Sequence, residues 1–255
     1  MGMSGEVLVE VDGPVATVTL NRPGRRNAIS GALLTGLRES MAELDARSEV
    51  RAIVLTGADP AFCAGLDLTE LGHPDGAIRK TSRGDVIPAL GKPLIGAING
   101  AAITGGLELA LACDFLIASE RARFADTHAR MGIQPGWGLT VELPAAVGLR
   151  RAREMSATGN FVDAQTALQW GLVNHVVPHE DLLTFSRKLA ADLATSDQAA
   201  LAAIFLTYNQ AAALTGREAR RIETANHAAW HTGGIDAARV AARRTAVIER
   251  GRTQS

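Results

Sequence analysis

Residues 99–114, NGAAITGGLELALACD, limit most strongly what this chain can fold into. A short apolar run at residues 93–98 precedes them and is typical of a buried strand. The Gly105-Gly106 pair follows, and then residues 107–112, which are rich in strong helix formers. The sequence therefore predicts a strand, a glycine turn and a helix, and the glycines let the backbone approach a ligand closely.

The first turn of that helix offers a site for negative charge. Its N–H groups have no partner within the helix and lie at the positive end of the helix dipole. Such an end stabilises an anion, including the oxyanion that develops during a reaction. Glu108 lies on this first turn. Its carboxylate either complements the dipole or takes part in acid–base chemistry, and the sequence pattern leaves both interpretations open.

A second glycine turn, around Gly65, follows another apolar strand at residues 51–56. Two strand ends, each followed by a backbone N–H at a glycine turn, could converge on one oxygen. That arrangement is a two-donor oxyanion hole, in which losing one donor costs about 3 kcal/mol of transition-state stabilisation. Spacing along the sequence cannot show that the two turns meet.

The remaining pattern predicts an α/β region through about residue 195 and a helical region at 196–255. Residues 6–11 and 15–20 read as a β-hairpin, and Ser30 is expected to cap a helix that runs to about Asp45. Further strands are expected at 114–118 and 172–177, and a helix at 164–170. Residues 140–157 read as helical, with breaks at Pro144 and Gly148. Residues 181–250 also read as helical, with breaks near Ser196, Gly216 and Gly233-Gly234. Residues 72–85 read as a polar loop.

Composition excludes several classes of function. A formal net charge of −1 gives no basic surface for nucleic acid, and the basic run at 150–153 reads as a solvated helix face. No membrane span is expected, because no stretch reaches about eighteen uninterrupted apolar residues. Without a signal-peptide pattern, and with two cysteines, Cys63 and Cys113, we expect a reduced cytoplasmic protein. No metal site is expected, since His227 and His231 lack a third ligand.

Short motifs in a fixed order cover nearly the whole chain. They are NRP at 21–23, NA at 27–28, AGLDL at 64–68, NGAAITGGLELA at 99–110, CD at 113–114, FA at 124–125, PG at 135–136, TG at 158–159 and ALQWGLV at 167–173. In this ordered set the chain resembles the crotonase superfamily, the enoyl-CoA hydratase/isomerase family. The resemblance implies a crotonase-type spiral of ββα units, with a C-terminal helical region that helps to build a homo-oligomer, a trimer or a dimer of trimers.

The resemblance also implies a shared chemistry, in which two backbone N–H groups stabilise the enolate of a CoA thioester. By motif position these groups are the N–H of Leu66 and the N–H of Gly105. The family's hydratases use two glutamates, one that helps to activate water and one that handles the proton at the α-carbon. The first of these corresponds to Glu108.

His128 occupies the position where the second glutamate is expected, and this is the most informative departure from the family pattern. Imidazole can serve as either acid or base, so His128 could replace the carboxylate. Asp126 could orient the ring if this segment is extended, because the two side chains would then share a face; otherwise Asp126 makes only a local turn or capping bond. Alternatively, His128 marks a site with lost or changed hydratase activity.

The expected activity is hydration of a 2-enoyl-CoA, with isomerisation, other enolate chemistry such as thioester hydrolysis, or silent acyl-CoA binding as alternatives. CoA enters as part of the substrate, and no other cofactor is implied. The family's binding turn implies contacts to substrate from Ala64, Asp67 and Leu68. Arg25 or Arg26 could contact a CoA phosphate or simply be solvated. Trp137 either walls off the acyl pocket or packs in the core.

Overall fold

The computed structural model describes residues 5–72 and 85–212 together with residues 214, 218, 221, 224, 225 and 229. Its contacts divide the chain into two compact units, Met1–Gln198 and Ala199–Ser255. The loop predicted at residues 72–85 falls almost wholly outside the described residues. The predicted boundary after residue 195 falls close to this division, and its functional meaning stays a prediction.

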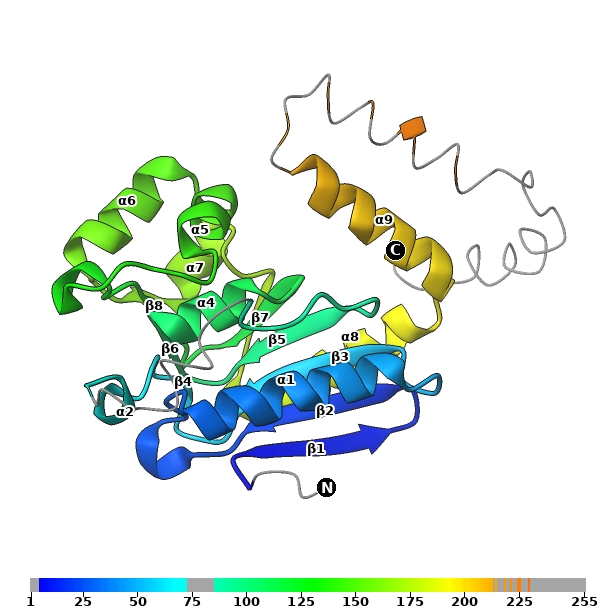
Figure 1. Cartoon of the computed structure of the whole chain (residues 1–255), viewed down its shortest axis with the longest axis horizontal. Helices are drawn as coiled ribbons and strands as arrows, with labels where there is room; N and C mark the ends of the chain where they lie inside the picture. The colour runs from blue at the N-terminus through cyan, green and yellow to red at the C-terminus, as the bar shows by residue number, and fades with distance from the viewer. Residues whose placement is uncertain are drawn as a thin grey trace, which may run out of the picture. The chain divides into compact units, whose positions relative to one another are not determined.

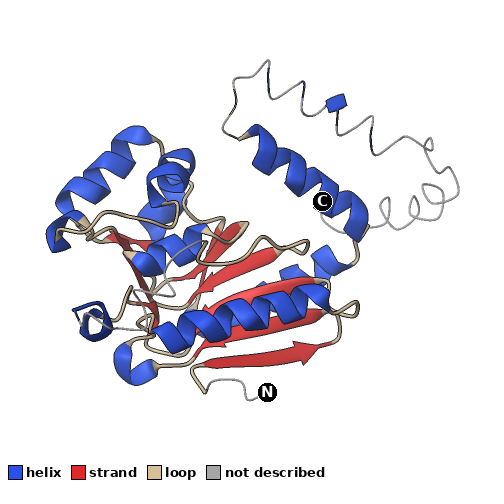
Figure 2. Ribbon diagram, viewed as in Figure 1, coloured by secondary structure: helices blue, strands red, loops and turns tan. Residues whose placement is uncertain are grey.

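The first unit is built on a six-stranded sheet (Figures 1 and 2). Strands β1 (Val7–Asp12) and β2 (Val15–Leu20) form the predicted antiparallel hairpin. Parallel strands follow beside β2 in the order β3 (Ala52–Gly57), β5 (Leu94–Ile98), β7 (Phe115–Ser119) and β10 (His175–Val177). The last strand is shorter than predicted, because Asn174 and the residues before it instead form the turn after a helix.

A second, four-stranded sheet was not located by the sequence pattern. It has the order β4 (Ala61–Cys63), β6 (Ala101–Ile103), β8 (Arg123–Ala125) and β9 (Val162–Asp163). Strands of two or three residues are too short for alternation to be visible. The pairs β3/β4, β5/β6 and β7/β8 each send one strand to each sheet. Helices α2 (Leu68–Gly72) and α4 (Gly105–Leu111) follow the first two pairs, which confirms the ββα spiral.

Helices cover both faces of the large sheet (Figure 1). Helix α1 (Gly31–Ala46) begins where predicted, because the Ser30 hydroxyl accepts the Leu33 N–H at 3.0 Å. Ile53 and Leu55 of β3 belong to the same core cluster as the buried side of α1. Alternate residues of the strand, Ala52 and Val54, pack with α8 (Leu182–Ala194) in a second cluster.

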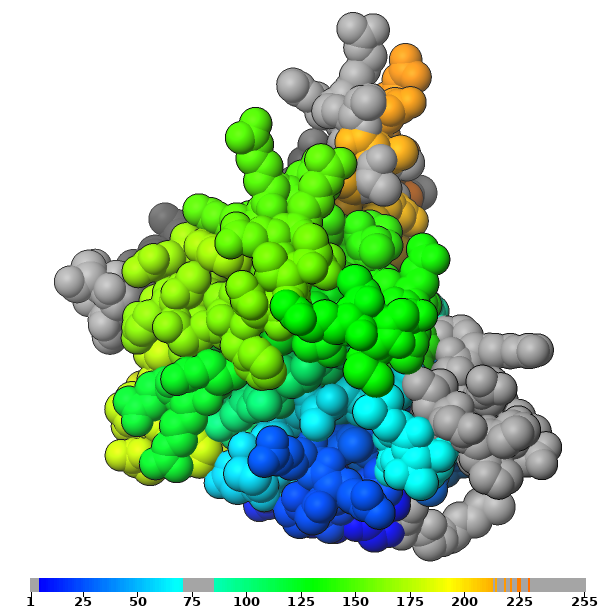
Figure 3. Space-filling model, turned by 90° about the vertical axis from the view of Figure 1, so that its left-hand side faces the viewer, coloured from blue at the N-terminus to red at the C-terminus, as the bar shows by residue number. Residues whose placement is uncertain are grey.

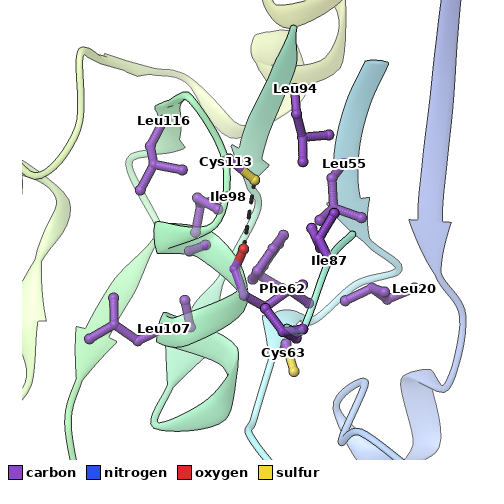
Figure 4. Close-up of a cluster of buried hydrophobic side chains, with 14 of the residues drawn as sticks. Leu20, Leu55, Phe62, Cys63, Ile87, Leu94, Ile98, Leu107, Cys113 and Leu116 are labelled. Carbon is purple, nitrogen blue, oxygen red and sulfur yellow. Dashed lines mark hydrogen bonds between the residues drawn. The ribbon is translucent and has the colours of Figure 1, made fainter. Parts of the chain in front are cut away.

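The larger core cluster continues between the two sheets and α4 (Figure 4). Phe62 and Cys63 of β4 and Leu107 of α4 are fully buried there. Cys113 lies at the far end of α4 and donates a long hydrogen bond from Sγ to the Leu109 carbonyl, 3.7 Å away. Burial raises the pKa of the Cys63 thiol to about 12, so this side chain packs as a small buried hydrophobe.

Three helices follow the last strand pair: α5 (Leu139–Val147), α6 (Leu149–Thr158) and α7 (Ala164–Trp170). The predicted break at Pro144 is wrong, since α5 continues through it and ends only at Gly148. Proline removes one backbone donor, and in this short helix the remaining bonds, such as Gly148 N–H to the Pro144 carbonyl, still form. The basic run of α6 is exposed apart from Ala152, as predicted.

Helix α9 (Gln198–Ala211) begins after a break near Ser196, as predicted. The predicted breaks at Gly216 and Gly233-Gly234 lie outside the described residues. Within the part of the chain that the structure describes, no single helix is long and apolar enough to cross a membrane; one bent pair, 179–194 with Gln198–Ala211, passes by length and composition alone.

Candidate active site

The turn after β4 presents one backbone donor. Gly65 has a φ of +97°, a conformation that glycine adopts without strain. Its carbonyl accepts the Ile29 N–H at 2.7 Å, and the Asp67 N–H donates to the Ile29 carbonyl at 2.9 Å. In this parallel bridge the N–H of the intervening Leu66 faces away from Ile29. Among the described residues, the Leu66 N–H donates no hydrogen bond.

The turn after β6 presents the second donor. Gly105 is the first residue of α4, and its N–H likewise donates no hydrogen bond to any described residue. A Cβ placed on Gly105 would lie 3.5 Å from the Leu66 nitrogen, and one placed on Gly65 would lie 3.5 Å from the Gly105 nitrogen. The fold therefore brings into contact the two turns that sequence spacing could not join.

Gly106 allows α4 to pack closely against the end of β4. A Cβ at this position would lie 2.1 Å from the Cys63 carbonyl oxygen, so only glycine fits against the end of β4.

Glu108 is buried on the first turn of α4, with 3% of its surface exposed. Its Oε1 accepts two backbone hydrogen bonds, from the Gly136 N–H at 3.1 Å and the Trp137 N–H at 2.7 Å. These two donors fix the orientation of the carboxylate and leave Oε2 on the other side. A carboxylate that only complemented the helix dipole would not need these two hydrogen bonds from Gly136 and Trp137.

His128 lies on that other side. Its Nε2 is 3.6 Å from Glu108 Oε2, and its Nδ1 is 2.7 Å from Asp126 Oδ1. The structure thus brings together the three acid–base residues that the sequence analysis singled out. With its hydrogen on Nδ1 the ring donates to Asp126, and Nε2 then faces Glu108.

The reason predicted for the Asp126–His128 contact is wrong. His128 has helical dihedrals (φ −54°, ψ −49°), so the two side chains do not share a face of an extended strand. Instead the chain turns after β8, and Asp126 Oδ1 accepts both the His128 N–H at 3.1 Å and the ring nitrogen. Burial raises the pKa of Asp126, but hydrogen bonds from His128 and Ser156 outweigh it and hold that pKa below its usual range.

A cavity of about 310 Å³ lies beside these groups. Its lining includes the predicted binding residues Arg25, Ala64, Asp67 and Leu68, together with Leu66 and His128. Thr104, Thr127 and Met131 also line it. Figure 3 shows the segments around it on one face, where cyan atoms near α2 lie between blue N-terminal atoms and green atoms of later segments.

Two predicted contact residues have other positions. Arg26 does not line this cavity; its carbonyl accepts the Ala64 N–H at 3.0 Å, so its backbone supports the turn while its side chain is exposed. Trp137 lies against the Gly105 turn, where the ring atom Cζ3 would be 3.4 Å from a Cβ on Gly105. The indole is therefore next to the two donors, partly buried against the core.

Arg22, which the sequence analysis named only within the NRP motif, holds together several residues beside this site. It bonds to the Ala28 carbonyl at 2.5 Å, to Asp67 at 3.1 Å and to Glu6 at 3.0 Å. Burial raises the pKa of Asp67, and the bonds from Arg22 and the Thr69 N–H more than offset it, so the pKa is lowered. In the sequence, the signal for this role is a charged residue directly before Pro23.

Asn27 holds the same loop from inside the protein. Its fully buried amide donates to the Ala58 and Ala61 carbonyls, both at 2.7 Å, and accepts the Arg22 N–H at 2.9 Å. All of its polar atoms are therefore paired, and its φ of +55° suits asparagine.

Other candidates lie apart from this site. His179 bridges the buried Ser119 hydroxyl (3.0 Å) and Asp59 (3.1 Å). Ser119 is fully buried, so this chain of bonds reads as a structural tie. His227 and His231 lie outside the described residues. Within the described ranges no group of three or more His, Cys, Asp or Glu residues could hold a metal.

The chain is similar to several known proteins. A family model described as enoyl-CoA hydratase/isomerase matches residues 10–236. A curated relative, a probable peroxisomal enoyl-CoA hydratase 1 from Arabidopsis thaliana, is 36% identical, with 89% of this chain and 88% of the relative covered. The crystal structure of an enoyl-CoA hydratase from Mycobacterium smegmatis is 47% identical, with a TM-score of 0.76 over 88% of this chain and 97% of that one. An enoyl-CoA hydratase structure from Bacillus anthracis is 33% identical, with a TM-score of 0.80 over 87% and 89% of the two chains.

Proposed function

Since the chain belongs to the enoyl-CoA hydratase/isomerase family, of the crotonase superfamily, we propose that it adds water to the double bond of a 2-enoyl-CoA thioester. The observation that carries this proposal is the meeting of two backbone donors, at Leu66 and Gly105, which bond to no other described residue, with the paired groups Glu108 and His128 close by.

The two donors hold the thioester oxygen. Charge develops on this oxygen when a nucleophile adds to the β-carbon, and fixed N–H groups stabilise it without reorganising. Each donor of this kind contributes about 3 kcal/mol to transition-state stabilisation. Leucine is suitable at position 66, because the donor belongs to the main chain.

Glu108 and His128 move the protons. The oxygen of water bonds to the β-carbon while Glu108 Oε2 takes one of its protons, and the π electrons of the double bond form an enolate. Glu108 then passes this proton to His128 Nε2, 3.6 Å from Oε2, and Nε2 delivers it to the α-carbon as the enolate returns to a thioester. One base and one acid on neighbouring carbons are the requirement of this addition, and the 3.6 Å separation of Oε2 and Nε2 suits it.

The cavity beside the donors takes the CoA part of the substrate. Arg25 is the lining cation that we propose for a CoA phosphate, with Ala64 and Leu68 contacting the pantetheine arm. Asp67 acts through its ion pair with Arg22, which fixes the turn that carries Leu66. We propose no cofactor besides the CoA of the substrate.

The test is the loss of the ultraviolet absorbance of a conjugated 2-enoyl-CoA on adding the protein. Glu108→Gln is expected to lower kcat at least 100-fold, since the amide oxygen can still accept from Gly136 and Trp137 but the base is gone. Unchanged turnover in this variant would reject the role of Glu108. Unchanged turnover in His128→Ala would reject only the paired-group mechanism.

A second candidate is isomerisation of a 3-enoyl-CoA, which one base can carry out. The specific observation in its favour is that His128 replaces the expected second glutamate. The two activities change absorbance in opposite directions, because hydration removes conjugation and isomerisation to a 2-enoyl-CoA creates it. Release of free thiol would indicate thioester hydrolysis instead. Binding without any of these changes would indicate a silent acyl-CoA-binding protein.

We also propose that the protein assembles as a trimer or a dimer of trimers through residues 196–255, in a reducing, cytoplasmic compartment. Exposed apolar side chains on α9, Ile204, Leu206 and Tyr208, support the first point, and two free buried cysteines support the second. Light scattering coupled to size-exclusion chromatography tests the assembly.

A further inference from the structure

The two halves of the proposed chemistry are joined by a pair of threonines. Thr104 directly precedes the Gly105 donor, and Thr127 directly precedes His128. Their hydroxyl oxygens are 2.5 Å apart, and the Thr127 N–H also donates to Thr104 Oγ1 at 3.2 Å. Both residues line the cavity.

Thr104 has an unusual backbone conformation, with φ +55° and ψ −112°. A β-branched residue in this region is strained by about 1–3 kcal/mol, and such strain persists only where the surroundings impose it. The ψ angle of residue 104 sets the plane of the next peptide bond, and so the direction of the Gly105 N–H. The strained angle therefore aims the proposed oxyanion donor.

Every polar group of Thr104 is used to hold this conformation. Its N–H donates to the Ala125 carbonyl at 2.8 Å, and its carbonyl accepts the Glu108 N–H at 3.0 Å. The hydroxyl bond to Thr127 is the contact between side chains. The peptide N–H that follows, at Gly105, is left without a partner among the described residues, as a ligand donor requires.

We propose that Thr104 and Thr127 are positioning residues: their hydroxyl pair holds the Gly105 N–H in the direction that polarises the thioester carbonyl, and ties it to the loop that carries His128. This inference rests on the proposed function for the identity of the ligand. It concerns how the thioester carbonyl is held and polarised, which can be measured separately from proton transfer.

The test compares Thr127→Val, which keeps the shape but loses the hydroxyl, with Thr127→Ser, which keeps the hydroxyl. Thr104→Ala and Thr104→Ser form a second matched pair. Two readouts are measured: kcat and KM for hydration, and the red shift in the absorbance of bound cinnamoyl-CoA, a conjugated thioester whose spectrum reports how strongly its carbonyl is polarised. His128→Ala serves as the control, because it removes proton transfer and leaves the donors in place.

We expect the valine and alanine variants to lose about tenfold in kcat, with KM within twofold of wild type, and to show a smaller red shift. The serine variants are expected to match the wild type in both readouts, and His128→Ala to lose kcat while keeping the red shift. A merely structural role would lower the melting temperature without reducing the red shift.

Two outcomes overturn the inference: a full red shift in Thr127→Val and Thr104→Ala with kcat within twofold of their serine partners, or no red shift in the wild type. Failure of the proposed function has a different signature. A wild-type protein that does not hydrate enoyl-CoA, but whose bound thioester shows a red shift that the valine variant lacks, rejects hydration and supports the threonine pair.

Discussion

The backbone donor at Leu66 can be deleted without removing any hydrogen bond among the described residues. Proline at this position lacks the N–H, whereas the bridge to Ile29 uses only the Gly65 carbonyl and the Asp67 N–H. The residue before a proline is restricted through its backbone N–H and its Cβ, and Gly65 lacks the Cβ part of this restriction. Leu66→Ala is the matched control, because it loses the same side chain and keeps the donor.

The expected loss follows from the energy of one donor. About 3 kcal/mol of transition-state stabilisation, at 1.36 kcal/mol for each factor of ten, corresponds to roughly 150-fold in kcat/KM. Leu66→Pro is therefore expected to fall about 150-fold below Leu66→Ala in the enoyl-CoA absorbance assay. Circular dichroism and thermal unfolding establish that both variants are folded. A folded Leu66→Pro within threefold of Leu66→Ala would refute the two-donor reasoning, since the donor would then contribute almost nothing.

Further predictions concern the fold around the site. Gly106→Ala places a methyl group 2.1 Å from the Cys63 carbonyl, so we expect a loss of at least about 2 kcal/mol in unfolding free energy, measured by urea denaturation; a wild-type midpoint would contradict the contact. Asn27→Ala leaves the Ala58 and Ala61 carbonyls unpaired, and we expect about 3 kcal/mol of destabilisation, or a melting temperature lower by about 6–12 °C. Since the pKa of Cys63 is raised to about 12, iodoacetamide at pH 8 should label neither cysteine in the native protein and both after unfolding, as read by mass spectrometry; native labelling of Cys63 would argue against its burial. Folding lowers the pKa of Asp126 below its ordinary value of about 3.9, so its ionisation contributes stability that is present above that pH and is lost as the pH falls through the folded-state pKa. The stability difference between wild type and Asp126→Asn should therefore shrink from pH 6 to pH 3, and a difference that grows toward low pH would contradict the sign of the shift.

Long elements with strong local signals were predictable from the sequence. The hairpin forms where its alternation indicates, one helix begins at its Ser30 cap, and the helix at Gly105 forms where strong helix formers follow the glycine pair. The small sheet was not, because its strands are two or three residues long and are held by pairing with distant strands. Pro144 shows the opposite failure: despite a strong local signal for a break, α5 keeps its remaining backbone hydrogen bonds and buries Leu139, Leu143 and Val147 in the core.

In the site, the residue types were predictable and their contacts were not. Glu108 and His128 stood out by motif position, but the amides of Gly136 and Trp137 that orient the carboxylate belong to a loop almost thirty residues away. Thr104 and Thr127 are likewise 23 positions apart in the sequence. Only the alignment of β6 with β8 brings the two threonines together, and single-sequence periodicity carries no information about that pairing.

The spacing of the two proposed oxyanion donors, the N–H groups of Leu66 and Gly105, follows from the small sheet. Strands β4 and β6 are parallel neighbours, and each ends just before one of the two glycine turns. Adjacent strands lie about 4.8 Å apart, while one oxygen can accept from two nitrogens separated by up to about 5.8 Å. The distance between the two proposed donors is thus set mainly by the main-chain pairing of β4 with β6, which has one register shift between Ala61 and Cys63. Under the proposed function, replacing His128 would therefore alter the proton chemistry and leave the spacing of the two main-chain donors unchanged.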